Sequence, residues 1–286
     1  MTNFSAGPIA VLGAGVMGTG VATLAVGCGF PVVLVDVSQD TLDKARAEVS
    51  QQLRLGRLMG ALDKDRTAGE LTTTTDLADV AGAVVVVESI TERAELKAKV
   101  LAEASEVVAV GTPVVTNTSA IPVDELADSV ARPADFLGVH FMNPPHFIRT
   151  VEVIRGPRTG PDALAAVLEL LEALGQRAVV VGDGPGFVVN RVLQRMLNEA
   201  ARIVEEGLAS PEDVDAVFTG CLGHRTGPLA TADLIGLDNV VDSLRVLHER
   251  TGDDGYRPCD LLLAKVDAGD FGRKTGRGFF DHGGSR

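Results

Sequence analysis

The chain has 286 residues, which is enough for two domains of ordinary size. Apolar residues make up 45% of it and charged residues 23%, a composition that is typical of folded globular proteins and excludes a disordered chain. The formal net charge of −13 repels phosphate backbones and anionic lipids, so we expect neither a nucleic acid nor a membrane as a partner.

The compartment follows from what the sequence lacks. The longest apolar run is far shorter than the ~20 residues of a membrane helix, and the first residues do not resemble a secretion signal. The cysteines Cys28, Cys221 and Cys259 are scattered, which indicates neither a disulfide framework nor a zinc site. We therefore expect a cytoplasmic protein without a bound metal.

Short apolar runs alternate with helical stretches in the first half of the chain. The expected strands are residues 8–12, 32–35, 83–87, 113–116 and 136–141. The expected helices between them are residues 16–27, 41–58 and 92–108. This alternation predicts an α/β fold with a doubly wound parallel sheet. Residues 38–70 exceed the length of one crossover helix and are predicted to form a helical hairpin.

The pattern changes near residue 184, where three glycines and a proline follow the last apolar run. The rest of the chain reads as helices at residues 188–206, 211–219, 232–250 and 258–268, and Pro211 follows a capping Ser210. We therefore predict a first domain over residues 1–183 and an all-helical domain over residues 184–286.

A glycine-rich segment of the form GxGxxG directly follows the first expected strand and opens the first expected helix. The first glycine permits a tight turn, the second lets a pyrophosphate approach the backbone, and the third permits close packing of the helix. The predicted nucleotide-binding residues of this segment are Gly13, Gly15, Val16, Met17 and Gly18.

Asp36 closes the second expected strand, 18 residues after Gly18. A carboxylate there would accept hydrogen bonds from the ribose hydroxyls of a dinucleotide and would repel a 2′-phosphate. The residues after Asp36 include no arginine, so the segment predicts a Rossmann-type domain that binds NAD rather than NADP. The alternative is that Asp36 only caps the helix that follows.

His140 ends an apolar strand, at the edge where open α/β sheets bind their ligands. Glu152 interrupts a β-branched segment 12 residues later, and a buried glutamate is costly unless it has a partner. A histidine on a neighbouring strand would supply that partner and form a general base. From these residues alone, a core histidine and an unrelated strand-edge acid remain an alternative.

Several motifs together carry a family resemblance. They are residues 13–18, VESITE (87–92), NTS (117–119), HFMNP (140–144), VEVI (151–154), PGFVVNR (185–191), GLD (236–238) and FGRKTGRGFF (271–280). Over nearly its whole length the chain resembles the 3-hydroxyacyl-CoA dehydrogenase family.

The resemblance implies an NAD-binding Rossmann domain, a helical domain that forms a homodimer, and an acyl thioester as substrate. By motif position His140 would take the proton of a C3 hydroxyl as hydride leaves for NAD, and Glu152 would orient it. Ser119 and Asn143 would hold the reacting oxygen and the nicotinamide region, and Asn190 would contact the substrate.

The resemblance also implies further cofactor contacts, because four residues of this chain stand where the family places them: Glu92, Lys97, Asn117 and Lys274. Simpler interpretations are that Glu92 and Lys97 are exposed on one helix, and that Lys274 is solvated in a basic tail.

Two segments depart from the fatty-acid enzymes of the family. Ala120 stands where a second serine is usual, and His224, Arg225 and Thr226 stand where the family has apolar and aromatic residues. These segments resemble a polyketide-pathway branch that oxidises a glyceryl group on an acyl carrier protein, and polar residues would suit such a group. We therefore expect a glyceryl-acyl carrier protein substrate.

Other substrates and classes remain open. 3-Hydroxybutyryl-CoA is the alternative substrate, and the polar residues would then belong to the surface. One alternative is a dehydrogenase for β-hydroxyacids, but many such enzymes use a lysine base rather than a His–Glu pair. Another is a non-enzymatic NAD-binding protein, which would be expected to lose one or more of four residues. All four are present here, namely His140, Glu152, Ser119 and Asn143.

Overall fold

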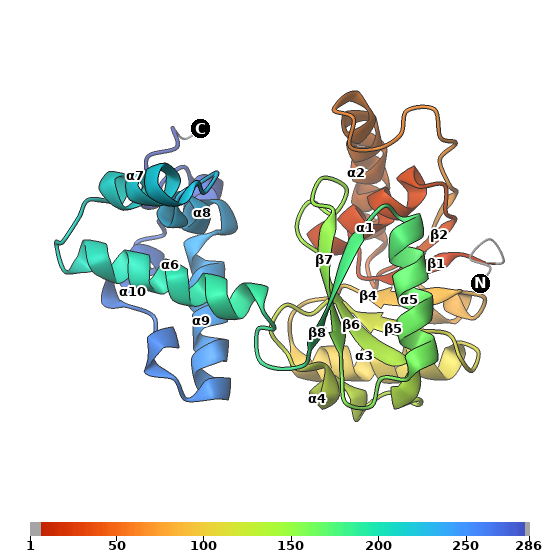
Figure 1. Ribbon diagram of the computed structural model, residues 1–286. Helices are drawn as coiled ribbons and strands as arrows, with labels where there is room; N and C mark the ends of the chain where they lie inside the picture. The colour runs from red at the N-terminus through yellow and green to blue at the C-terminus, as the bar shows by residue number, and fades with distance from the viewer. Residues whose placement is uncertain (1–6, 284–286) are drawn as a thin grey trace. The chain divides into compact units, whose positions relative to one another are not determined.

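The computed structural model describes residues 7–283, and the chain divides into two compact units, residues 1–184 and 185–286 (Figure 1). We call them the N-terminal unit and the C-terminal unit.

The N-terminal unit is built on an eight-stranded sheet in the order β3-β2-β1-β4-β5-β6-β7-β8. The strands are β1 (Ile9–Leu12), β2 (Val32–Val35), β3 (Leu71–Thr74), β4 (Val85–Glu88), β5 (Val114–Thr116), β6 (Phe136–His140), β7 (Thr150–Arg155) and β8 (Arg177–Gly182). Pairing is parallel from β3 through β6, antiparallel between β6 and β7, and parallel again between β7 and β8. The predicted Rossmann-type doubly wound sheet is therefore confirmed.

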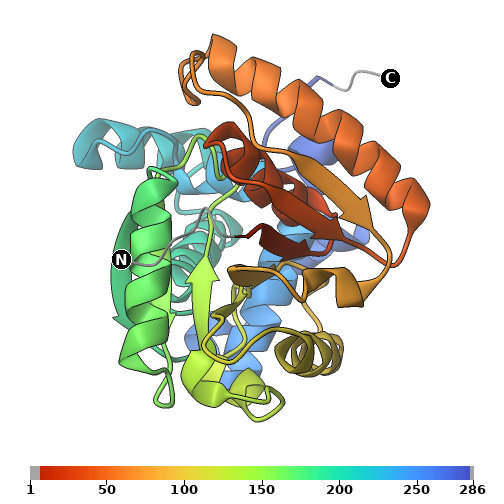
Figure 2. The same ribbon diagram turned by 90° about the vertical axis from the view of Figure 1, so that its right-hand side faces the viewer.

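Helices cover both faces of this sheet. They are α1 (Val16–Gly27), α2 (Gln39–Leu58), α3 (Ala94–Val107), α4 (Val123–Ala127) and α5 (Pro161–Ala173). Helices α1 and α5 share an apolar core with alternate residues of the strands, whereas α3 and α4 pack on the opposite face. Figure 2 shows the long α2 (orange) lying beside α1 (red).

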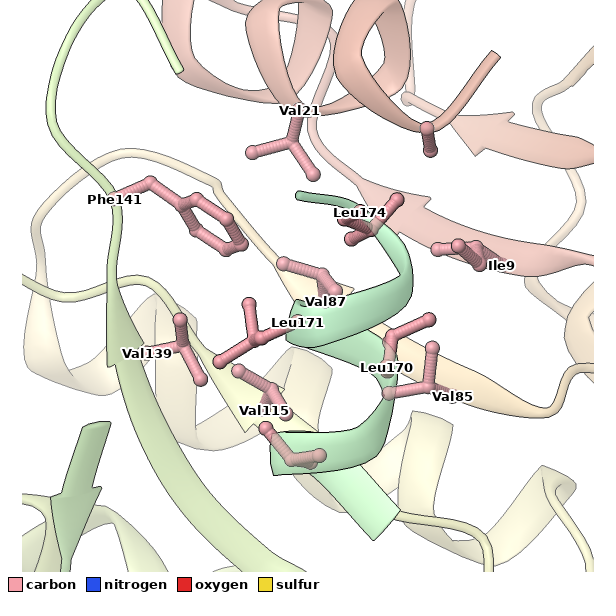
Figure 3. A pocket seen from close by; sticks show the side chains of 12 residues that line it. Ile9, Val21, Val85, Val87, Val115, Val139, Phe141, Leu170, Leu171 and Leu174 are labelled. Carbon is pink, nitrogen blue, oxygen red and sulfur yellow. The ribbon is translucent and has the colours of Figure 1, made fainter. Parts of the chain in front are cut away.

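The core between α5 and the sheet encloses one small apolar cavity. Ile9, Val87, Val115 and Val139 line it from the four adjacent strands β1, β4, β5 and β6, and leucines of α5, such as Leu171, close it (Figure 3). Its volume of about 10 Å³ is at the lower limit for one water molecule, and its lining has no polar side chain. The cavity is therefore an imperfection of packing and not a ligand site.

The predicted helical hairpin at residues 38–70 is wrong. The segment holds the single helix α2, whose N-terminus is capped by Ser38, and turns and bends then lead to β3. Gly60 follows the helix with a left-handed φ of 71°, and the polar stretch 63–66 offers no apolar face for a second helix. Strand β3 was not predicted because its Leu-Thr-Thr-Thr sequence is only partly buried at the sheet edge.

The C-terminal unit is helical, as predicted. Its helices are α6 (Val189–Glu205), α7 (Pro211–Leu222), α8 (Pro228–Ile235), α9 (Leu237–Thr251) and α10 (Asp260–Asp267). The helix predicted over residues 232–250 is two helices, because Gly236 breaks it with a φ of 99°, a conformation that glycine adopts without strain. No helix within residues 7–283 is both long and apolar enough to cross a membrane.

Short 3-10 helices complete the description. They lie at Leu77–Val80, Pro133–Asp135, Asp254–Tyr256 and Arg273–Thr275.

Asp233 ties the last described residues to the core of the C-terminal unit. This buried carboxylate accepts hydrogen bonds from the backbone N–H groups of Phe279 and Phe280, at 2.8 and 3.0 Å. The ring Nε2 of His282 lies 2.7 Å from its Oδ2. Charge-assisted contacts of this kind offset the cost of burying the carboxylate.

The first turn of α1 provides a test of how closely the chain is packed there. A Cβ on Gly18 would lie 1.8 Å from the carbonyl oxygen of Gly13, whereas a Cβ on Gly15 would meet no atom within 4 Å. We expect Gly18→Ala to lower the free energy of unfolding by about 1–3 kcal/mol, as overpacking does. Gly15→Ala is the control and should change it by less than about 0.5 kcal/mol. Urea unfolding measures both, and equal midpoints would contradict the proposed packing constraint.

Candidate active site

The glycine-rich loop between β1 and α1 has the geometry of a phosphate site. Gly13 has a left-handed φ of 94°, and a Cβ there would lie 2.7 Å from the carbonyl oxygen of Ser89. Gly15 is exposed, with open space where a side chain would begin. The backbone N–H groups of Val16, Met17 and Gly18 stand in the first turn of α1, where helices leave such donors for an anion. This arrangement fits a dinucleotide pyrophosphate.

Asp36 is held against this loop. Its Oδ2 accepts a hydrogen bond from the N–H of Ala14 at 2.9 Å, and its Oδ1 accepts one from the N–H of Ser38 at 3.0 Å. The cap of α2 is Ser38, whose hydroxyl accepts from the N–H of Thr41, so Asp36 is not the helix cap. A carboxylate has about four acceptor sites, so Asp36 retains acceptor capacity for ribose hydroxyls.

His140 and Glu152 form a buried pair on the strands β6 and β7. The antiparallel register places these two residues directly opposite each other, and Nδ1 of His140 lies 2.8 Å from Oε2 of Glu152. An ionised carboxylate can only accept, so Nδ1 donates and the basic lone pair of the ring lies on Nε2. The predicted pairing across neighbouring strands is confirmed.

Asn117 and Ser119 lie where β5 ends, beside the pair. The side-chain oxygen of Asn117 accepts a hydrogen bond at 2.9 Å from the N–H of Phe141, the residue that follows His140. The backbone N–H and the hydroxyl of Ser119 both donate to Oε1 of Glu92, at 2.8 and 3.2 Å. Asn117 therefore joins the carboxyl ends of β5 and β6, and Ser119 joins the loop after β5 to Glu92.

The simpler interpretation of Glu92 and Lys97, as two exposed residues of one helix, is wrong for Lys97, whereas Glu92 is exposed but lies outside the helix. Glu92 precedes α3, which begins at Ala94, and Lys97 is only 1% exposed. The Lys97 ammonium contacts Oε1 of Glu88 at 2.7 Å, Oε2 of Glu92 at 3.1 Å and the carbonyl oxygen of Ile90 at 3.3 Å. Three protein oxygens occupy its three N–H groups, which argues against the expected direct contact with a cofactor.

The surroundings of Glu92 favour its ionised form. Burial raises the pKa of Glu92. The Lys97 ammonium and the hydrogen bonds from Thr118 and Ser119 lower this pKa, and together their effect is larger than that of burial. The pKa of Glu92 therefore lies below its ordinary value.

Three further predicted site residues belong to other segments of the chain. Asn143 is exposed in the loop that follows β6, at a cis peptide bond to Pro144. Asn190 and Lys274 belong to the C-terminal unit, where Lys274 forms an ion pair with Asp238 instead of being solvated alone. The contacts of Asn143, Asn190 and Lys274 with substrate or cofactor stay predictions.

Sequence reasoning missed Glu88, which is fully buried at the end of β4. Its Oε2 accepts a hydrogen bond from the hydroxyl of Thr116 at 2.7 Å. The signal was available, because an acid that ends an apolar strand needs a buried partner for the same reason as Glu152. Within residues 7–283, no cluster of three or more His, Cys, Asp or Glu residues could hold a metal ion.

A glycine loop with a carboxylate at the end of the next strand, on the same sheet as a buried His–Glu pair, is typical of a dehydrogenase of the Rossmann type. Residues 8–184 match the NAD-binding domain of 3-hydroxyacyl-CoA dehydrogenases, and residues 186–282 match their C-terminal domain. The chain belongs to the 3-hydroxyacyl-CoA dehydrogenase family and is an NAD-dependent oxidoreductase.

Individual proteins agree with this assignment over nearly the whole chain. A Deinococcus radiodurans protein named probable 3-hydroxybutyryl-CoA dehydrogenase is 41% identical, over 95% of this chain and 99% of its own length. The crystal structure of (S)-3-hydroxybutyryl-CoA dehydrogenase PaaH1 from Ralstonia eutropha is 37% identical, with a TM-score of 0.89 and coverage of 97% and 99%. That of FadB2 from M. tuberculosis is 35% identical, with a TM-score of 0.91 and coverage of 96% and 98%.

The buried pair yields a kinetic prediction. Glu152→Gln removes the charge that holds and stabilises the protonated ring of His140, so kcat should fall by about 10²–10⁴-fold, as after loss of general-base catalysis. His140→Ala should lower kcat at least as much. In both variants the Kd for NAD should stay within about twofold of that of the unaltered protein, because neither residue belongs to the glycine loop. Steady-state NADH formation and NAD titration measure these effects. Glu70→Gln, at an exposed acid, is the control, and unchanged kcat in Glu152→Gln would refute the role.

Proposed function

We propose that the protein oxidises the 3-hydroxyl group of a short-chain 3-hydroxyacyl-CoA, above all 3-hydroxybutyryl-CoA, with NAD as the hydride acceptor. The observation that carries the proposal is the buried His140–Glu152 pair at the carboxyl end of β6, in the sheet that also bears the glycine loop of the NAD-binding domain. The names of the relatives support the choice of acyl group.

The proposed chemistry uses few groups of the chain. Nε2 of His140 takes the proton of the C3 hydroxyl, and Glu152 stabilises the imidazolium that forms. Ser119 and Asn143 would hold the reacting oxygen, and Asn190 would contact the acyl group. Bound NAD supplies the acceptor for the hydride of C3, so the alcohol becomes a carbonyl and loses two electrons and two hydrogens in balance.

NAD itself would be held by the groups described above. The glycine loop and the first amides of α1 would bind the pyrophosphate, and Asp36 would bind the adenosine ribose. The position of Asn117 beside the end of β6 is compatible with a contact to the nicotinamide region.

The expected preference for a glyceryl-acyl carrier protein lacks support. Two of the exposed polar residues behind that expectation, His224 and Thr226, have local partners within the C-terminal unit. The ring of His224 lies edge-on to Phe218 at 5.4 Å, and the hydroxyls of Thr226 and Thr231 are 2.9 Å apart. These contacts account for two of the three residues without a polar acyl group, which favours the CoA ester.

The substrate is tested by comparing two thioesters. With NAD in excess, NADH formation from 3-hydroxybutyryl-CoA should exceed that from glyceryl-loaded carrier protein by at least about tenfold in kcat/KM. His140→Ala supplies the background rate for each substrate. Faster turnover of the carrier-bound glyceryl group would overturn the proposal.

We also propose that the C-terminal unit forms a homodimer, as the family resemblance implies. Helices α7 and α8, which pack against each other, expose three large apolar side chains, Val217, Leu222 and Leu234, at 56%, 62% and 60%. Exposed apolar residues that gather on neighbouring elements often mark a protein interface.

The dimer is tested by light scattering after size exclusion. The unaltered protein should have twice the chain mass, and Leu222→Glu should shift it toward the monomer because a buried charge in an interface is costly. Leu58→Glu, at an exposed leucine of α2 in the N-terminal unit, should leave the dimer unchanged. A monomeric unaltered protein at micromolar concentration would refute the proposal.

A further inference from the structure

A cluster of charged residues contacts the loop that follows β5 (residues 117–122, which we call the Ser119 loop). This cluster has no part in the chemistry proposed above. It consists of Glu88, Lys97 and Glu92, and we call it the Lys97 cluster. Glu88 and Lys97 are fully buried, at 0% and 1% exposure, and Glu92 is partly exposed. Strand alternation places Glu88 and Thr116 on the face of the sheet that α3 covers, the same face as His140.

Glu88 has a partner for both of its oxygens. Oε1 accepts from the Lys97 ammonium at 2.7 Å and from the N–H of Ile90 at 2.7 Å, while Oε2 accepts from the hydroxyl of Thr116 at 2.7 Å. Such full pairing makes the buried charges tolerable, yet apolar residues of similar volume would often stabilise a core equally well. Stability alone therefore does not explain the presence of an ion pair at this position.

Glu92 transmits the position of this ion pair to the loop after β5. Its Oε2 lies 3.1 Å from the Lys97 ammonium. Its Oε1 accepts from the hydroxyl of Thr118 at 2.6 Å, from the N–H and hydroxyl of Ser119, and from the N–H of Ala120 at 3.2 Å. One carboxylate oxygen thus gathers four donors from three consecutive residues, so its placement determines where the Ser119 hydroxyl lies.

We propose that Glu88 is a positioning residue for catalysis. It holds the Lys97 ammonium, which holds the Glu92 carboxylate, which in turn sets the backbone and hydroxyl of Ser119. The inference rests on the proposed function, in which Ser119 contacts the reacting oxygen of the substrate. It assigns Lys97 to this chain of contacts in place of a direct cofactor contact.

The geometry makes a specific demand on kinetics. If Glu88 acts only through Ser119, its removal costs activity while Ser119 can still contact the substrate, and costs nothing further once the Ser119 hydroxyl is gone. A residue that merely supports the fold would instead lower activity by the same factor in both backgrounds, because independent effects add in free energy.

The test is a double-mutant cycle of Glu88→Gln and Ser119→Ala, measured as kcat/KM for 3-hydroxybutyryl-CoA with NAD in excess. We expect each single variant to lose about tenfold or more, and the double variant to lie within about twofold of Ser119→Ala alone. The KM for NAD should change by less than about twofold in Glu88→Gln, because the glycine loop and Asp36 are untouched. Glu95→Gln, at an exposed acid of α3, is the matched control and should retain full activity.

The outcomes separate the two proposals. Multiplied losses in the double variant would overturn the role of Glu88 while leaving the proposed function intact. Full activity in Ser119→Ala would overturn the assignment of Ser119 to the substrate, and no turnover by the unaltered protein would overturn the proposed substrate itself. If Glu88→Gln does not fold, Thr116→Val takes its place in the same cycle, because it removes the hydroxyl that donates to Oε2 of Glu88.

Discussion

A buried carboxylate requires donors, and this requirement organises both units of the protein. The carboxylate of Glu152 contacts the ring of His140, and that of Glu88 contacts the ammonium of Lys97 and the hydroxyl of Thr116. The carboxylate of Asp233 contacts two backbone N–H groups and the imidazole of His282. In each case the partner comes from a different element, so the polar contact also fixes how those elements meet. At the carboxyl edge of the sheet the same contacts build the candidate active site.

The reversal of direction between β6 and β7 forms the buried His140–Glu152 pair. The antiparallel register brings together two residues that are 12 apart in sequence and lie on the same side of the sheet. The carboxylate of Glu152 is therefore preorganised against Nδ1 before any substrate arrives. This arrangement leaves the basic lone pair on the other ring nitrogen, as the proposed role of His140 as the base in the oxidation of an alcohol requires.

Much of the fold and part of the site could be predicted from residue patterns. The short apolar runs that alternate with helical stretches predicted the parallel strands from β1 to β6 except β3. The spacing of the glycines predicted the glycine-rich loop between β1 and α1. The break at Gly236, the single helix of residues 38–70 and the edge strand β3 were missed, because short polar strands and glycine breaks carry little local signal. The cluster around Lys97 was missed because a lysine on an expected helix gives no sign of burial.

The sequence alone determined the class of this protein. The features that identify the class are the spacing of the glycines, the acid at the end of the second strand and the order of the family motifs. These features are local, so they can be recognised in the sequence before the fold is known. Only the tertiary structure decided that Lys97 is buried, that Glu88 is its partner and that Glu92 gathers the Ser119 loop. The physical reason is that burial and pairing depend on contacts between β4, α3 and the end of β5, which approach one another only when the sheet and its helices have assembled.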